Sequence, residues 1–72
     1  MTTTEQTVTH QRCIGYQRAA GKGPQGQAAT LLASVYEGIR EDGHTVWRVC
    51  LPDGTVGQWG EAKPHIDIAR EP

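Results

Sequence analysis

The fold of this chain depends on residues 27–42, QAATLLASVYEGIRED, because this stretch fits the patterns of two different secondary structures. On a helical wheel its apolar residues form one stripe, with Ser34 and Glu37 on the opposite side. The stripe consists of Ala28, Leu31, Leu32, Val35, Tyr36 and Ile39. The segment begins with good helix formers, and Asp42-Gly43 provides a suitable helix end. These features favour an amphipathic helix.

The same residues also fit a β-strand. Gly38 would cost up to about 1 kcal/mol inside a helix, and Val35 and Tyr36 prefer strands. Asp42-Gly43 is also a strong signal for a hairpin turn. Because Ala-rich sequence packs poorly in a sheet, the helix is the preferred interpretation and the strand is the alternative. The alternative leads to a five-stranded SH3-like or OB-like small β-barrel, with a favourable pair between Glu37 and Arg48 across strands.

Residues 44–60 carry the clearest pattern, that of a β-hairpin. The turn Pro52-Asp53-Gly54 has the residue types of a three-residue loop. Such a loop places Leu51 opposite Thr55 and, further along the arms, Trp47 opposite Trp59. We therefore expect both tryptophans on the same face of this hairpin.

The remaining segments predict further elements around the hairpin. Alternation of apolar and polar residues over 7–18 predicts a first strand that is irregular near Arg12. Residues 19–26 contain three glycines and a proline, which predicts an exposed, mobile loop. Residues 65–69 alternate again and predict a last edge strand.

These elements together predict an α+β fold with the order β-α-β-β, in which one amphipathic helix packs on a short antiparallel sheet. We expect one small single domain over residues 7–69, because a chain of 72 residues is too short for two cores. The polar ends, residues 1–6 and 70–72, are expected to be disordered tails.

The composition limits the class of protein. No apolar run approaches the roughly 20 residues of a membrane span, and the first residues lack the features of a signal peptide. Two cysteines allow at most one disulfide, which indicates a reducing compartment, so we expect a cytoplasmic protein without a membrane partner. So short a chain buries only about 60–65% of its surface and leaves little room for a deep pocket. An enzyme is therefore not expected.

Two local patterns could indicate ligand chemistry. Residues 21–26, GKGPQG, match the glycine fingerprint of dinucleotide-binding proteins, but 72 residues cannot build that fold and Pro24 removes one amide. His10 and Cys13 have the spacing of half a zinc site, and the second close pair is missing. We therefore expect no catalytic residue, no cofactor and no metal.

Lack of a pocket and a plain, nearly neutral composition favour a protein that works through its surface. We expect a small non-enzymatic binding protein that regulates or inhibits a larger cytoplasmic protein machine by direct contact, as phage-type inhibitors of RNA polymerase do. It would be a monomer or a homodimer. The candidate partner-binding residues are Arg12, Arg18, Lys22, Arg48, Gln58, Asp67 and Arg70.

The aromatic residues leave a second function open. Trp47, Trp59, Tyr16 and Tyr36, placed on a sheet beside basic residues, could bind single-stranded nucleic acid. In a chain without Phe the same side chains are also needed for packing. A net charge of −1 gives no general basic surface, so nucleic acid is the alternative and not the favoured partner.

Overall fold

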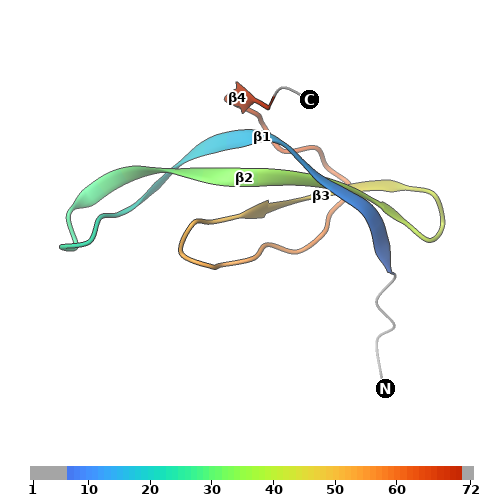
Figure 1. Cartoon of the computed structure of the whole chain (residues 1–72), viewed down its shortest axis with the longest axis horizontal. Coiled ribbons are helices and arrows are strands. Elements are labelled where there is room, and N and C mark those ends of the chain that lie inside the picture. The colour runs from blue at the N-terminus through green and yellow to red at the C-terminus, as the bar shows by residue number, and fades with distance from the viewer. Residues whose placement is uncertain (1–6, 71–72) are drawn as a thin grey trace, which may run out of the picture.

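The computed structural model describes residues 7–70, which form one antiparallel sheet of four strands (Figure 1). The strands are β1 (Val8–Lys22), β2 (Ala28–Arg40), β3 (Thr45–Cys50) and β4 (Ile68–Ala69), in the spatial order β3-β2-β1-β4. Residues 7–70 contain no helix. The predicted α+β fold with a β-α-β-β order is therefore wrong, and the fold is all-β. The expected tails lie outside the described residues, except for Arg70.

The correction concerns residues 27–42, which form β2 instead of the preferred helix. β2 pairs with β1 on one side and with β3 on the other, so it is the central strand of the sheet. Its apolar residues are divided between the two faces of the sheet, because successive side chains of a strand point in opposite directions. β3 and β4 lie at opposite edges, so the sheet is open and is not the five-stranded barrel of the alternative.

The two faces are named here after residues of β2 and its neighbours. The glutamate face carries Val35 and Glu37, with Trp47 of β3 opposite Glu37. The tyrosine face carries Tyr36, with Arg48 of β3 opposite it. The suggested pairing of Glu37 with Arg48 is thus wrong, since the two residues belong to different faces.

β1 and β2 continue together beyond the rest of the sheet as a two-stranded ribbon, residues 17–33, which we call the arm (Figure 1). β3 pairs with β2 only over Ser34–Ile39, and β4 pairs only with Gly15 and Tyr16. The arm closes with a tight turn in which the Gly23 amide donates to the Gln27 carbonyl at 2.7 Å. The loop expected over residues 19–26 is therefore much shorter, and residues 19–22 belong to β1.

Two register shifts interrupt the pairing of β1, between Thr9 and Arg12 and between Cys13 and Gly15. They lie where the sequence predicts an irregular strand. The second shift brings Gly15 close to the C-terminal segment, where a Cβ at this position would stand 2.6 Å from the Ile66 side chain. A larger residue than glycine would therefore push that segment away from the sheet.

The predicted hairpin after β3 is confirmed at its turn and wrong at its far end. The Leu51 amide donates to the Thr55 carbonyl at 2.8 Å, as the three-residue loop requires. Trp47, however, pairs with Gly60, and each donates to the other's carbonyl at 2.8 and 2.9 Å. One extra residue in the second arm shifts the register. As a result Trp59 packs on the tyrosine face, where its ring lies 3.2 Å from the Cβ position of Gly38.

The buried core is thin and divided between both faces. Among the described residues only Ala33, Val35 and Val46 are buried hydrophobic residues with no exposed surface. Ala33 and Val35 belong to the glutamate face, whereas Val46 lies opposite Gly38 on the tyrosine face. Residues 60–67 cross the sheet from the outer edge of β3 to the outer edge of β1, where β4 pairs (Figure 1). The expected edge strand over 65–69 is thus reduced to Ile68–Ala69.

Candidate interaction surface

A strip of weakly polar and apolar side chains crosses the tyrosine face from edge to edge, half-buried in its middle and exposed at both ends. The strand register places one residue of each segment in a single row. The row consists of Ile68, Tyr16, Ser34, Cys50 and Val56. Val56 is 57% exposed and Ile68 is 38% exposed, and Leu32, in the adjacent row, is 48% exposed. The three residues are among four large hydrophobic side chains that residues 7–70 leave exposed. We call this row together with Leu32 the apolar strip.

Basic side chains surround the apolar strip. Arg18 stands opposite Leu32 in the arm, and Lys22 follows four residues later on the same face. Arg48 lies in the row next to Cys50, and Arg70 follows β4. Glu37 is the single carboxylate within the four strands, and it belongs to the opposite face. The tyrosine face of the strands is therefore positively charged, although the whole chain carries a net charge of −1.

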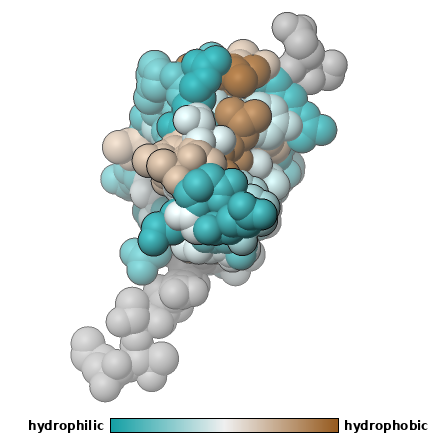
Figure 2. Space-filling model, turned by 90° about the vertical axis from the view of Figure 1, so that its left-hand side faces the viewer, coloured by the Kyte–Doolittle hydropathy of each residue, from teal (hydrophilic) through white to brown (hydrophobic). Residues whose placement is uncertain are grey.

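Seen from the arm end, apolar side chains gather in a group that hydrophilic side chains flank on both sides (Figure 2). An exposed apolar group with a polar rim is the typical arrangement of a binding surface on a soluble protein. Tyr16 within the strip, and Arg48 and Trp59 beside it, are of residue types that are enriched at interface centres.

Arg48 is held in one position by its neighbours. Its guanidinium lies 4.5 Å from the ring centre of Trp59 and 6.0 Å from that of Tyr36. Its Nη2 donates to the Gln11 Oε1 at 3.2 Å. The Nε atom is buried and has no hydrogen-bond partner among the described residues. Cation–π contact stabilises the charge at this place, so Arg48 presents a fixed cation beside the strip.

Arg70 provides a second cation on the same face. A hydrogen bond with the Cys13 side chain raises the pKa of Arg70, and the nearby Tyr16 raises it further. Cys13 stands opposite Tyr36 in the sheet. Arg70 therefore lies on the tyrosine face near Cys13 and Tyr16.

Asp67 belongs to the edge of the sheet and not to the strip. Its Oδ2 accepts the backbone amide of Arg18 at 2.8 Å, and its own amide donates to the Tyr16 carbonyl at 2.9 Å. His65 Nε2 lies 2.9 Å from the other carboxylate oxygen. The backbone hydrogen bond from Arg18 is the main reason why the pKa of Asp67 is lowered. Asp67 thus covers the outer edge of β1 beside β4.

Glu37 organises the opposite face. Its Oε1 lies 3.2 Å from Arg12 Nη2, and its Oε2 accepts the indole N–H of Trp47 at 3.2 Å. Arg12 is therefore separated from Arg18 and Lys22, with which the sequence grouped it. The structure places four of the predicted binding residues, Arg18, Lys22, Arg48 and Arg70, on the same face, while Gln58 is exposed in the segment beyond β3.

Sequence reasoning missed the apolar members of the surface, Leu32, Val56 and Ile68. The sequence placed Leu32 in the apolar stripe of the expected helix, and it gave no reason for Val56 or Ile68 to stay exposed. The signal that could have identified Leu32 is the alternation of side chains between the two faces of a strand. In a strand over 27–42, Leu32 shares a face with Ser34 and Tyr36.

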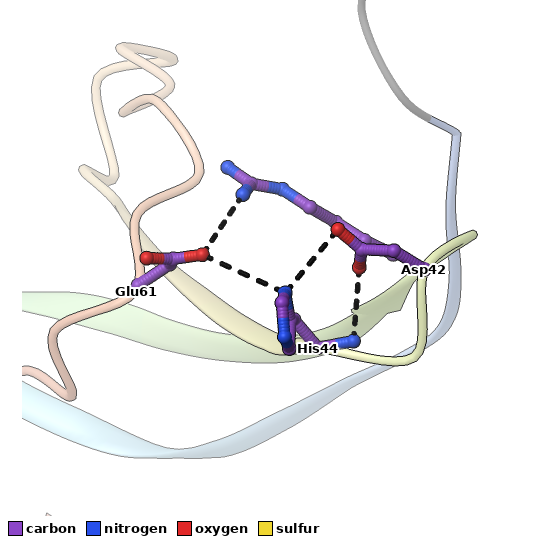
Figure 3. A network of polar contacts seen from close by, with 4 residues as sticks. Asp42, His44 and Glu61 are labelled. Atoms are coloured by element: carbon purple, nitrogen blue, oxygen red, sulfur yellow. Dashed lines mark hydrogen bonds and ion pairs between the residues drawn. The ribbon is translucent and has the colours of Figure 1, made fainter.

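A polar network joins the β2–β3 turn to the segment after β3 (Figure 3). His44 Nδ1 lies 3.2 Å from an Asp42 oxygen and 3.8 Å from a Glu61 oxygen, and Arg40 Nη1 lies 3.4 Å from the same Glu61 oxygen. The His44 amide donates to Asp42 at 3.0 Å and is the main cause of the lowered pKa of Asp42. Exposed ion pairs contribute little stability, so we assign this network the role of aligning the turn.

The patterns that could indicate ligand chemistry have structural explanations. Residues 21–26 lie in the arm and its turn, which connects two antiparallel strands, so the strand-to-helix context of a nucleotide fingerprint is missing. Within residues 7–70 no group of three or more His, Cys, Asp or Glu residues is placed to hold a metal ion. Cys13 and Cys50 are free and belong to β1 and β3, which β2 separates.

Comparisons of this chain with protein-family models, with curated proteins and with solved structures gave no match. In the part of the chain that the structure describes, no helix has the length and apolar character needed to cross a membrane.

Proposed function

We propose that this protein is a small non-enzymatic binding protein, which docks its tyrosine face onto a larger protein in the cytoplasm and thereby regulates or inhibits that partner. The observation that supports this proposal is the apolar strip, which spans the whole width of the sheet and is exposed at Leu32, Val56 and Ile68. Because residues 7–70 include only three fully buried hydrophobic residues, covering the strip would add much to the buried apolar surface.

The charge around the strip indicates the chemistry of the partner. Arg18, Arg48 and Arg70 line the strip without a carboxylate from the strands on the same face. A complementary surface would have an apolar centre and carboxylates at its rim, because opposite potentials increase the association rate and exclude wrong partners. A second copy of the tyrosine face would place like charges against each other, so a different protein is the better fit.

The alternative of single-stranded nucleic acid fits the geometry less well. Bases stack on the open faces of aromatic rings. One face of the Trp59 ring is already occupied by the Arg48 guanidinium at 4.5 Å, and the ring packs against Gly38. The most suitable aromatic platform of the tyrosine face is therefore not open to a base.

The test compares two isoleucines of nearly equal exposure on opposite faces. Ile68 on the tyrosine face is 38% exposed, and Ile39 on the glutamate face is 39% exposed. Tagged wild type, Ile68→Asp and Ile39→Asp would be used to isolate partners from the native host's extract, with Val56→Asp as a second variant of the strip. We expect a stoichiometric protein that wild type and Ile39→Asp retain and that Ile68→Asp and Val56→Asp lose.

Circular dichroism of each variant would first establish that the sheet is intact. Equal retention of the partner by all variants, or no stoichiometric protein with wild type, would contradict the proposal. Salt-sensitive binding of an oligothymidine strand in a mobility-shift assay, lost in Ile68→Asp and kept in Ile39→Asp, would instead assign the face to nucleic acid.

A further inference from the structure

Arg48 differs from the other basic residues in its surroundings. Among the arginines and lysines of residues 7–70, only Arg40 and Arg48 are half-buried, whereas the others are exposed. Arg40 forms an ion pair with Glu61 at 3.4 Å, but no carboxylate of the described residues forms an ion pair with Arg48. Charges that are removed from water are normally paired. Arg48 is therefore a half-buried cation whose counter-charge the described chain does not provide.

Gln11 orients the guanidinium of Arg48 without neutralising it. The first register shift of β1 contains His10 in a left-handed conformation, with a φ of 55°. Bulges of this kind redirect side chains. Here Arg12 turns to the glutamate face, while Gln11 Oε1 accepts a hydrogen bond from Arg48 Nη2 at 3.2 Å. The amide oxygen of Gln11 is neutral, so it fixes the direction of the guanidinium and leaves its charge available.

The remaining contacts define where an anion can approach Arg48. The rings of Trp59 and Tyr36 flank the guanidinium at 4.5 and 6.0 Å, and the Nε atom is buried. Nη1 is not buried and has no hydrogen bond to residues 7–70. N–H groups on the two Nη atoms match the two oxygens of a carboxylate. Cys50 follows two residues later on the same face, so the apolar strip begins about 7 Å from Arg48.

We infer that Arg48 binds a carboxylate side chain of the partner protein, next to an apolar residue that covers the strip at Cys50. The inference rests on the proposed function for the source of this carboxylate. It adds the residue that selects the partner, because a neutral side chain at this place would cover Arg48 and leave its charge unpaired. Arginine beside tryptophan and tyrosine is also the typical composition of an interface hot spot.

The test uses a small probe, hydrocinnamate, which joins a carboxylate to an apolar ring, and compares it with its neutral amide. Each compound is titrated into the full chain at constant ionic strength. Two-dimensional nitrogen–proton NMR spectra follow the Arg48 Nε–H and the backbone amides of β3. We expect saturable shifts with hydrocinnamate and a Kd roughly tenfold higher for the amide, as for the loss of one charge-assisted hydrogen bond. This comparison needs no substitution, so unfolding cannot imitate its result.

A matched pair of substitutions locates the site. Gln11→Glu supplies Arg48 with a carboxylate from within the chain, so it should raise the Kd of hydrocinnamate roughly tenfold while the fold is kept. Gln25→Glu adds the same charge at the exposed turn of the arm and should bind as wild type does. Arg48→Met should also lose the probe, whereas Arg12→Met, on the opposite face, should retain it.

Three outcomes would overturn the inference: no saturable shifts around Arg48, equal affinity for the amide, or equal weakening by Gln11→Glu and Gln25→Glu. The partner isolated with wild type separates the inference from the proposed function. A partner that Gln11→Glu retains as well as wild type does would leave the proposed function standing and refute the carboxylate contact. Carboxylate-specific binding of the probe without any stoichiometric partner would refute the proposed function and leave Arg48 as a carboxylate site.

Discussion

Two valines provide the sharpest test of where this small sheet keeps its stability. Val35 has no exposed surface, whereas Val56 is 57% exposed, and replacement by alanine deletes the same atoms at both positions. At about 0.8 kcal/mol for each buried methylene-sized group, Val35→Ala should lose roughly 1.6 kcal/mol, and an unfilled cavity should raise this to about 2.5 kcal/mol. Val56→Ala should stay within about 0.5 kcal/mol of wild type.

The assay is urea unfolding followed by far-UV circular dichroism at one fixed protein concentration, because association would otherwise change the midpoint. A chain of this length has a free energy of unfolding of roughly 4–11 kcal/mol, so the loss at Val35 should be easy to measure. Val46→Ala, on the tyrosine face, should lose as much as Val35→Ala because it is equally buried. Equal losses for Val35→Ala and Val56→Ala would refute the described core.

Three further results are expected. Gly38→Ala should destabilise the protein by about 1–3 kcal/mol in the same assay, since the added Cβ would overlap the Val8 side chain and approach the Trp59 ring at 3.2 Å, and an unchanged midpoint would contradict this packing. Asp67→Asn should make the free energy of unfolding less dependent on pH in the acid range. The lowered pKa of Asp67 stabilises the fold at pH values above the pKa of the unfolded state, and this contribution is lost as the pH falls through the lower pKa of the folded state. Parallel pH curves for wild type and variant would argue against the bond from Arg18. Without reductant, a thiol assay in denaturant should find two free thiols per chain, and fewer would indicate a disulfide.

The sequence predicted the turns and the irregular strand more reliably than the identity of the central element. The three-residue turn of the hairpin was correct because Pro52, Asp53 and Gly54 act locally. Whether residues 27–42 are helix or strand is decided by their long pairing with β1, which no local pattern contains. Leu31 and Leu32 fit a helical stripe, yet the sheet uses both faces and so separates them.

For the candidate surface, the sequence showed which residues are basic but not on which face of the sheet each of them lies. The sequence identified the basic residues but not that Arg12 would turn to Glu37 on the other face, because the register shift before Gly15 decides this. The extra residue that separates Trp59 from Trp47 was equally hidden, since it follows from hydrogen bonds between Trp47 and Gly60. Both features depend on strand register, which side-chain composition alone does not determine.

The separation of the two tryptophans gives each face of the sheet its own optical probe. Trp47 donates its indole N–H to Glu37, while Trp59 lies beneath the guanidinium of Arg48 on the face proposed for docking. In a Trp47→Phe chain all indole emission comes from the docking side, and in a Trp59→Phe chain all of it comes from the reverse side. A ligand that changes the emission of one chain and leaves the other unaltered would reveal which side it covers, with no label attached.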